Sequence, residues 1–351
     1  MAAELTWPTV LGKLTEGVDL TVEEAAWAMG EIMSDSATGS QIAAFGVAVK
    51  MKGAAPTELR GLAQAMLDRA HRVTTAVPTV DIVGTGGDRS HTVNISTMTS
   101  IVVAAAGVPV IKHGNRAASS KSGGADVLEA LGVAINLGAA AVERCVAEVG
   151  IGFCFAPVFH PAFRFAGPPR REIGIPTVFN VLGPLTNPAA PPTGLIGCAF
   201  SDLAPTLAQT FADRGNRVLV VRGDDGLDEL TTTTTSTVWQ VVNGQVNQLR
   251  VDPAELGLEL VELAALQGGD AEQNAQIARD LFDGARGPVR DAVTLNAAAA
   301  LVAFEQDGIY SQIEFNEALG GAMTRIGEVL DSGAAAHLLA QWAQLSSSLA
   351  D

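Results

Sequence analysis

The chain has 351 residues, of which 48% are hydrophobic, so it is long enough to form two domains with well-buried cores. Its formal net charge of −16 argues against a general binder of nucleic acids or membrane surfaces, because such proteins need a positively charged face. The three cysteines, Cys145, Cys154 and Cys198, lie within or beside apolar runs. Their odd number and their positions favour buried free thiols over a disulfide framework or a metal site.

The sequence contains no targeting or membrane signal. Its N-terminus lacks the basic start and apolar core of a signal peptide. The longest apolar stretch, from Ile101 to Ile111, is well short of the roughly 20 residues that span a bilayer. We therefore expect a soluble cytoplasmic protein with neither a nucleic-acid nor a membrane partner.

Residues 1–75 show only helical patterns and predict a small helical domain. The capping-box sequence at residues 21–24 predicts the start of a helix that ends near Met33. An apolar segment over residues 41–51, and apolar residues at helical spacing after Pro56, predict two more helices. Their apolar surfaces equally suit a subunit interface.

Residues 76–351 predict a larger α/β domain, in which short β-rich runs alternate with helical windows. The expected strands cover residues 80–83, 108–111, 151–155, 195–200 and 218–221. The expected helices between them cover residues 97–106, 125–131, 139–149 and 203–214. This alternation predicts a mainly parallel central sheet flanked by helices, whose ligand site lies at the carboxyl ends of the strands. The threonine-rich tract 231–237 is expected to be a strand or to lead into one.

The first of two glycine-rich turns follows the strand expected at residues 80–83. Its sequence, Gly84-Thr85-Gly86-Gly87-Asp88, exposes backbone N–H groups, because glycine lets an anion approach the main chain closely. Residues 94–97, Asn-Ile-Ser-Thr, then open a helix whose N-terminal N–H groups and hydroxyls suit a pyrophosphate. The glycines alone are equally compatible with an ordinary tight turn.

The second turn, Lys112-His113-Gly114-Asn115-Arg116, directly follows the strand expected at residues 108–111. Lysine supplies a compact charge and arginine a planar fork for phosphate oxygens, and Lys121 adds a third cation to this cluster. Asn115 can both donate and accept hydrogen bonds, which suits an amine or carboxylate substrate. We interpret His113 as a ligand contact, although a lone histidine is more often a packing residue.

Further candidates lie later in the chain. Asp228 and Glu229 follow the strand expected at residues 218–221, and adjacent carboxylates beside a pyrophosphate are typical ligands of Mg²⁺. On an exposed turn the same pair would be ordinary solvated charge. Arg170, which follows two prolines, is either a surface residue or a bidentate partner for a substrate carboxylate.

Five motifs in order resemble the anthranilate phosphoribosyltransferases, a family of the tryptophan pathway. These motifs are residues 84–88, 94–97, 112–116, 178–188 and 228–231, and the resemblance runs from about Leu11 to the C-terminal helices. It implies transfer of the 5-phosphoribosyl group from phosphoribosyl pyrophosphate (PRPP) to the amino group of anthranilate. The products are N-(5-phosphoribosyl)anthranilate and pyrophosphate. It also implies a helical domain joined to an α/β domain of the nucleoside-phosphorylase type, a homodimer, and packing of a segment near residues 160–190 against the helical domain.

The resemblance also assigns site residues. For PRPP it implies contacts from Gly84, Gly87, Asp88, Thr92, Asn94, Ser96, Thr97, Lys112 and Ser120. To these we add residues of the same turns: Ile95, His113, Gly114, Asn115, Arg116, Ser119 and Gly124. Anthranilate is expected to contact Gly84, Asn115 and Arg170, and two Mg²⁺ ions are expected at Ser96, Asp228 and Glu229. No residue is assigned as an acid or base, because a neutral aromatic amine is already nucleophilic.

One position departs from the family pattern. Gly124 stands where serine is commoner, and this removes one possible hydroxyl contact to the diphosphate. Two other functions remain open on the sequence. A nucleoside phosphorylase would share the architecture, although the motifs at residues 94–97 and 228–231 favour the transferase. The second alternative is a non-catalytic protein that binds a nucleotide or nucleic acid. The acidic charge and the intact carboxylates count against this function.

Overall fold

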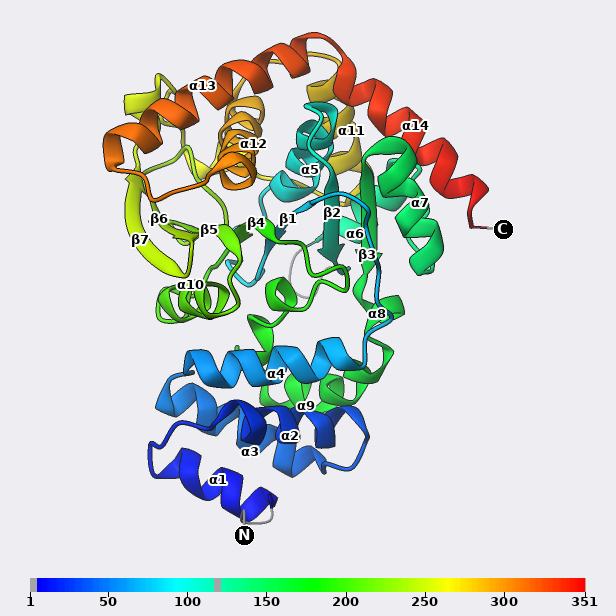
Figure 1. Ribbon diagram of the computed structural model, residues 1–351. Helices are drawn as coiled ribbons and strands as arrows, with labels where there is room; N and C mark the ends of the chain where they lie inside the picture. The colour runs from blue at the N-terminus through cyan, green and yellow to red at the C-terminus, as the bar shows by residue number, and fades with distance from the viewer. Residues whose placement is uncertain (1–4, 117–120, 351) are drawn as a thin grey trace.

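The computed structural model describes residues 5–116 and 121–350, and Figure 1 shows a helical layer below a twisted sheet that carries further helices. The helical layer is formed by α1 (Trp7–Thr15), α2 (Val22–Met33), α3 (Gly39–Lys52) and α4 (Pro56–Asp68). The predicted capping box is confirmed. The Thr21 side chain accepts a hydrogen bond from the N–H of Glu24, and the Glu24 carboxylate accepts one from the N–H of Thr21.

The sheet has seven strands in the order β3-β2-β1-β4-β5-β6-β7. Its strands are β1 (Val80–Gly84), β2 (Val110–Gly114), β3 (Ile151–Phe155), β4 (Thr193–Gly197), β5 (Arg217–Gly223), β6 (Ser236–Val242) and β7 (Gln245–Val251). A strand forms at each of the five predicted places, although β2 and β4 are displaced by two or three residues from the predicted bounds 108–111 and 195–200. These five strands run parallel, whereas β6 and β7 are antiparallel. The threonine-rich tract leads into β6, and β7 was not predicted.

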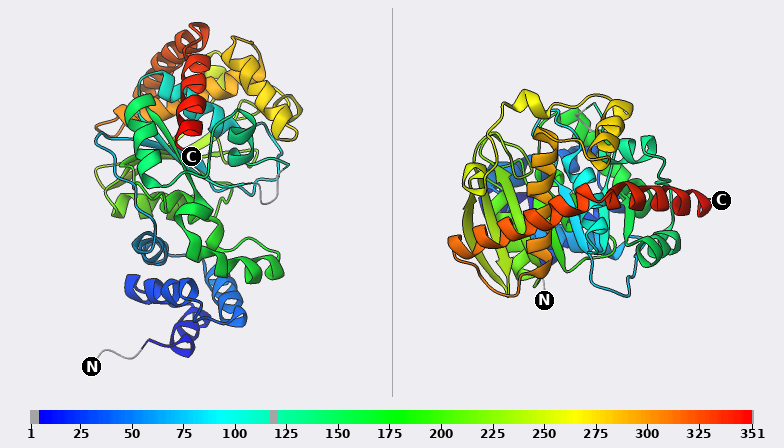
Figure 2. Two further views of the ribbon diagram at one scale, coloured as in Figure 1. Left: turned by 90° about the vertical axis from the view of Figure 1, so that its right-hand side faces the viewer. Right: turned by 90° about the horizontal axis from the view of Figure 1, so that it is seen from above.

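Most of the helices between and after the strands lie on the two faces of the sheet, whereas the short helix Gly167–Ile173 packs against α3 of the helical layer. The helices that follow β1 are α5 (Ile95–Ala105), α6 (Gly124–Ala130), α7 (Ala139–Val149), α8 (Ala156–Phe159), α9 (Gly167–Ile173), α10 (Ala204–Asp213), α11 (Ala271–Phe282), α12 (Pro288–Glu305), α13 (Gln312–Asp331) and α14 (Ala334–Ser348). In Figure 2, seen from above, α13 and α14 cross the top of the molecule. Among the described helices, none combines the length and the apolar composition that crossing a membrane requires.

Two hydrophobic clusters hold these layers together. Alternation along β1 places Ile82 in the cluster shared with α5 and α11–α14, and Val83 in the cluster shared with α10 and the helical layer. Phe179 and Leu182 also belong to the second cluster, which includes buried residues of α1–α4. The second cluster therefore connects the helical layer to the sheet.

The strand order places a topological switch point between β1 and β4. From β1 the chain moves outward to β2 and β3, and from β4 it moves outward in the other direction to β5. Crevices for ligands form at the carboxyl ends of strands at such points. Here Gly84 at the end of β1 is paired in register with Gly197 at the end of β4.

Candidate functional site

The turn that carries Asp228 lies directly over the switch point. A Cβ atom on Gly197 would come within 1.5 Å of the Asp228 backbone oxygen, and one on Gly84 would come within 2.0 Å of Asp228 Oδ2. Only glycine allows this close approach at either position. Asp228 Oδ2 also accepts a hydrogen bond of 2.7 Å from the N–H of Gly86. The fold thus joins the first glycine turn to the later carboxylate turn.

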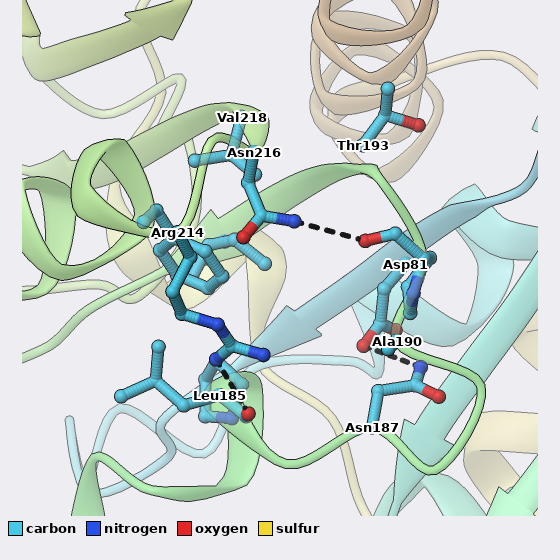
Figure 3. Close-up of a pocket in the computed structure, with 12 residues that line it drawn as sticks. Asp81, Leu185, Asn187, Ala190, Thr193, Arg214, Asn216 and Val218 are labelled. Atoms are coloured by element: carbon cyan, nitrogen blue, oxygen red, sulfur yellow. Dashed lines mark hydrogen bonds between the residues drawn. The ribbon is translucent and has the colours of Figure 1, made fainter. Parts of the chain in front are cut away.

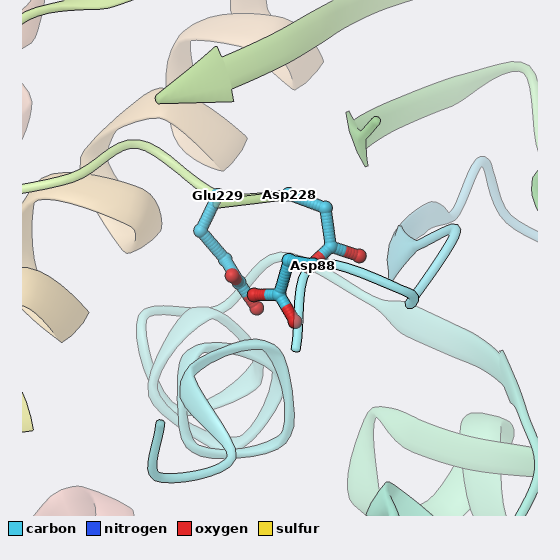
Figure 4. Close-up of side chains that lie close together, drawn as sticks. All are labelled: Asp88, Asp228 and Glu229. Atoms are coloured by element: carbon cyan, nitrogen blue, oxygen red, sulfur yellow. The ribbon is translucent and has the colours of Figure 1, made fainter. Parts of the chain in front are cut away.

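Three carboxylates gather at this point. Asp88, Asp228 and Glu229 each present an oxygen atom, and these atoms lie within 4.8 Å of one another (Figure 4). Burial, with the nearby charge of Asp88, raises the pKa of Asp228 to about 6, and burial also raises the pKa of Glu229. Glu229 Oε2 is buried and has no hydrogen-bond partner among the described residues. An unpaired oxygen among three carboxylates suits a hard cation such as Mg²⁺.

Lys112 approaches the carboxylates from β2. Its ammonium group is buried and donates hydrogen bonds to the backbone oxygen of Ile82 and, over 3.2 Å, to Ser96 Oγ. Burial lowers the pKa of Lys112 to about 8, while the charges of Asp81, Glu229 and Asp228 oppose this shift. The predicted residues Lys112 and Ser96 therefore lie together on the floor of the site.

The N-terminus of α5 has no side-chain cap. Asn94 stands at the N-cap position, but its side chain is used elsewhere. Its Oδ1 accepts a hydrogen bond of 2.8 Å from Asn274 Nδ2, and its Nδ2 donates one of 3.2 Å to the backbone oxygen of Ser122. Ile95 has its side chain in the core, and its backbone N–H already donates a hydrogen bond of 2.7 Å to the backbone oxygen of Val93. An uncapped helix start of this kind is suited to an anion.

The departure at Gly124 has a steric reason. Gly124 begins α6, and a Cβ atom there would lie 3.0 Å from Thr97 Oγ1, which is closer than side chains normally pack. Thr97 is itself 1% exposed, so it has little room to yield. Serine at position 124 would require Thr97 to shift, whereas glycine lets the starts of α5 and α6 approach.

A cavity of about 550 Å³ lies beside the glycine turns and contains all three residues expected to contact anthranilate, Gly84, Asn115 and Arg170. The Arg170 guanidinium lies 5.4 Å from the ring centre of Phe163 and 6.0 Å from that of Phe179. Burial lowers its pKa. No carboxylate of the described chain forms an ion pair with Arg170, which leaves its charge available for an anionic ligand.

Two histidines also line this cavity, and only His113 was predicted. His113 Nδ1 donates to the backbone oxygen of Gly183 over 3.0 Å, and His160 Nε2 donates to that of Thr186 over 2.7 Å. Burial lowers the pKa of His113 to about 3 and also lowers that of His160, so both rings are neutral. His113 Nε2 is buried without a hydrogen-bond partner among the described residues, whereas the His160 ring also interacts with the backbone of Met66. His160 follows the short helix α8, which itself begins directly after β3, so its place near the end of a predicted strand was the available sequence signal.

Other predicted contacts have different surroundings. Arg116 is exposed, and its Nη1 pairs with Asp126 at 2.7 Å and with Glu129 at 2.5 Å, so its charge is already balanced. Thr92 forms a backbone bridge with Gln267, and Gly114 leaves room for the ring of Phe153. Gly87 has a positive φ of 92°, a backbone conformation that favours glycine. Ser119 and Ser120 lie outside the described residues.

A second, much smaller pocket lies beside residues 184–187 (Figure 3). Its free volume of about 20 Å³ is enough for roughly one water molecule. Asp81 accepts a hydrogen bond of 2.8 Å from Asn187 Nδ2, and Arg214 Nη1 donates one of 2.8 Å to the backbone oxygen of Leu185. These bonds fasten residues 185–187 to β1 and α10. This pocket is therefore structural, and the 550 Å³ cavity is the candidate substrate site.

The chain matches known proteins along its length. The family model described as "Glycosyl transferase family, helical bundle domain" matches residues 8–70, and that described as "Glycosyl transferase family, a/b domain" matches residues 76–336. The anthranilate phosphoribosyltransferase of Rhodococcus jostii (strain RHA1) is 66% identical over 345 residues, which cover 98% of this chain and 94% of the relative. That of Nocardia farcinica (strain IFM 10152) is 61% identical, with 97% and 100% covered.

Solved structures show the same arrangement. The anthranilate phosphoribosyltransferase of Thermus thermophilus superposes with a TM-score of 0.88 at 38% identity, covering 96% of this chain and 99% of that one. The Saccharomyces cerevisiae protein, solved in complex with PRPP and Mg, superposes with a TM-score of 0.87 at 26% identity, covering 99% of each chain. The similarity therefore includes both the helical layer and the sheet.

Proposed function

We propose, on the premise that this chain belongs to the anthranilate phosphoribosyltransferase family of glycosyl transferases, that the carboxyl edge of its sheet carries the family's reaction. The enzyme transfers the 5-phosphoribosyl group of PRPP to the amino group of anthranilate and releases pyrophosphate, a step of tryptophan biosynthesis. The observation that carries the site assignment is the contact between Asp228 and the first glycine turn, since it brings carboxylates to an anion-binding loop.

PRPP and Mg²⁺ occupy the donor half of the site. Asp228, Glu229 and Ser96 hold Mg²⁺, two ions in all, and the position of Asp88 adds a third carboxylate to this set. When bound, Mg²⁺ stabilises the negative charge that the departing pyrophosphate takes up. The backbone at Gly87 and the start of α5 bind the phosphate oxygens, while the N–H groups of Thr85 and Gly86 donate to Gly197 and Asp228 and hold the turn in place. Lys112 adds a positive charge to the floor of this half.

Anthranilate occupies the 550 Å³ cavity. Arg170 binds its carboxylate, and Asn115 and the Gly84 backbone orient the ring. The unpartnered Nε2 of His113 is the hydrogen-bond acceptor for the amino group of anthranilate. Since a neutral aromatic amine is already nucleophilic, these residues need only align it with the ribosyl carbon. The chain thus contributes alignment and electrostatic stabilisation rather than a strong general base.

The helical layer serves assembly in this proposal. Residues 1–75 form the dimerisation domain and residues 76–351 the phosphoribosyl-transfer domain. Met51 is 81% exposed and Val47 36% exposed, both on α3, and exposed apolar side chains on one helix suit a homodimer interface. The same proposal places the enzyme in the cytoplasm.

The test is a fluorescence assay of anthranilate consumption with PRPP and Mg²⁺. We expect the anthranilate signal to fall only when protein, PRPP and Mg²⁺ are all present. Incubation with uridine or thymidine plus phosphate serves as the comparison for a nucleoside phosphorylase. Release of free base there, with no loss of anthranilate, would contradict the proposal.

A further inference from the structure

A buried side-chain amide lies behind the carboxylate turn. Asn296, in the middle of α12, is 1% exposed. Its Oδ1 accepts a hydrogen bond of 3.0 Å from the N–H of Leu230, and its Nδ2 donates one of 2.8 Å to the backbone oxygen of the same residue. Nδ2 also donates one of 2.9 Å to the backbone oxygen of Ala292, one turn earlier in α12. One amide therefore satisfies both backbone groups of Leu230, and its own helix fixes its orientation.

The helix that carries Asn296 is a rigid support. Residues 297–300 of α12 are all 0% exposed, and the helix packs against β1, β4, β5 and α5. Leu230 immediately follows Glu229 and is itself 0% exposed. Asn296 also lines the small pocket around Ser96, Asp228 and Glu229. The position of Leu230, and hence of the two carboxylates before it, is thus set by α12 relative to the sheet.

We propose that Asn296 is a positioning residue that holds the Asp228–Glu229 pair at the spacing its Mg²⁺ requires. This inference rests on the proposed function, in which the pair binds Mg²⁺ beside PRPP. Removing the amide leaves the N–H and C=O of Leu230 buried without partners, and this penalty is relieved only if the turn moves. The position of the Glu229 carboxylate should change most, because its buried Oε2 has no hydrogen-bond partner among the described residues to hold it in place. Loss of a contact that orients metal ligands typically changes metal affinity 10- to 100-fold.

Gln240 offers a matched control. It lies on β6, is 0% exposed and makes the same kind of contact with another loop. Its Oε1 accepts a hydrogen bond of 3.0 Å from the N–H of Tyr310, and its Nε2 donates to the backbone oxygen of Gly308 over 2.9 Å. Residues 306–310 line neither the carboxylate pocket nor the 550 Å³ cavity. Loss of Gln240 should therefore destabilise the fold without changing the metal site.

The experiment compares Asn296→Ala and the similarly shaped Asn296→Leu with Gln240→Ala and Gln240→Met. Mn²⁺ serves as the probe, and its binding to full-length protein with PRPP is followed by the electron paramagnetic resonance signal of free Mn²⁺. The double variant Asp228→Ala/Glu229→Ala lacks the proposed metal ligands, so it measures how much Mn²⁺ is bound by PRPP alone. Thermal unfolding of each variant confirms that it is folded at the temperature of the titration.

We expect the Mn²⁺ dissociation constant to rise about tenfold or more in both Asn296 variants and to stay within about twofold of the wild type in both Gln240 variants. An unchanged constant in a folded Asn296 variant overturns the inference, and so does an equal rise in the Gln240 variants. If the wild type binds no more Mn²⁺ than the double variant, the metal assignment of the proposed function fails instead, and Asn296 has no metal site to position.

Discussion

The carboxylate of Asp228 accepts a hydrogen bond of 2.7 Å from the backbone N–H of Gly86, a residue 142 positions earlier in the chain. This contact links the first glycine turn to the carboxylate turn that contains Asp228. It is possible because neither Gly84 nor Gly197 has a side chain, so the Asp228 turn can lie directly on the ends of β1 and β4.

Replacing Gly197 by alanine should displace the Asp228 turn. The added Cβ atom would lie 1.5 Å from the Asp228 backbone oxygen, so either the turn or β4 must move. We expect a loss of about 1–3 kcal/mol in the free energy of unfolding and a fall of at least about tenfold in kcat/KM. Chemical denaturation and steady-state kinetics measure the two effects.

Gly321→Ala is the control for this substitution. Gly321 lies inside α13 with no atom within 4 Å of its added Cβ, so alanine should leave activity unchanged and raise stability by about 0.5–1 kcal/mol. If Gly197→Ala were as active as the wild type, the close approach of the Asp228 turn would have no functional importance.

Replacing Arg170 by alanine should weaken anthranilate binding selectively. Arg170 lines the 550 Å³ cavity and has no ion-pair partner in the described parts of the chain, so its expected partner is the substrate carboxylate. We expect the KM for anthranilate to rise about 10- to 100-fold, the equivalent of one charged hydrogen-bonded pair, while the KM for PRPP changes much less. Arg171→Ala, its neighbour outside the cavity lining, should leave both constants unchanged. An unaltered anthranilate KM in Arg170→Ala would remove Arg170 from this role.

Replacing Asp228 and Glu229 together by alanine should abolish the magnesium-dependent rate. These residues supply two of the three clustered carboxylates, including the unpaired Glu229 Oε2. The rate should fall by more than about 100-fold at any Mg²⁺ concentration, because the ligands themselves are lost. Asp224→Ala, which removes an exposed carboxylate bonded to Thr235 and Thr237, should retain nearly full activity. Full activity of the double variant would refute the metal assignment.

Without divalent metal, Asp228 should make the protein less stable as pH rises. Burial raises its pKa from the ordinary value of 3.8 to about 6, so between about pH 4 and pH 6 the folded state binds more protons than the unfolded state. The free energy of unfolding therefore decreases through this window, by an amount on the order of 1–3 kcal/mol. Urea unfolding from pH 4 to pH 7 in a chelating buffer, compared between the wild type and Asp228→Asn, isolates this contribution. The variant should show a flatter profile, and a steeper or identical one would contradict the pKa shift.

Much of the local structure was predictable because it depends on short-range patterns. The capping box at Thr21 and the runs that form β1 to β5 satisfy their backbone groups within a few residues or through simple parallel pairing. β7 was missed because its residues, with the burial pattern of an edge strand, carry little apolar signal. The ion pairs of Arg116 could not be predicted for a similar reason. Its partners Asp126 and Glu129 lie on α6, and the sequence pattern does not specify how close α6 comes to Arg116.

The sequence by itself determined which chemical groups are available and that they follow the ends of parallel strands. The glycine turns, Lys112, Arg170 and the Asp228–Glu229 pair were all recognisable from residue type and position. Only the tertiary structure decided how they meet. It brought Asp88 to the other carboxylates, placed His160 beside His113 and set Asn296 behind Leu230. These are contacts between segments far apart in the chain, and they depend on strand order and helix packing, which no local pattern of residues encodes.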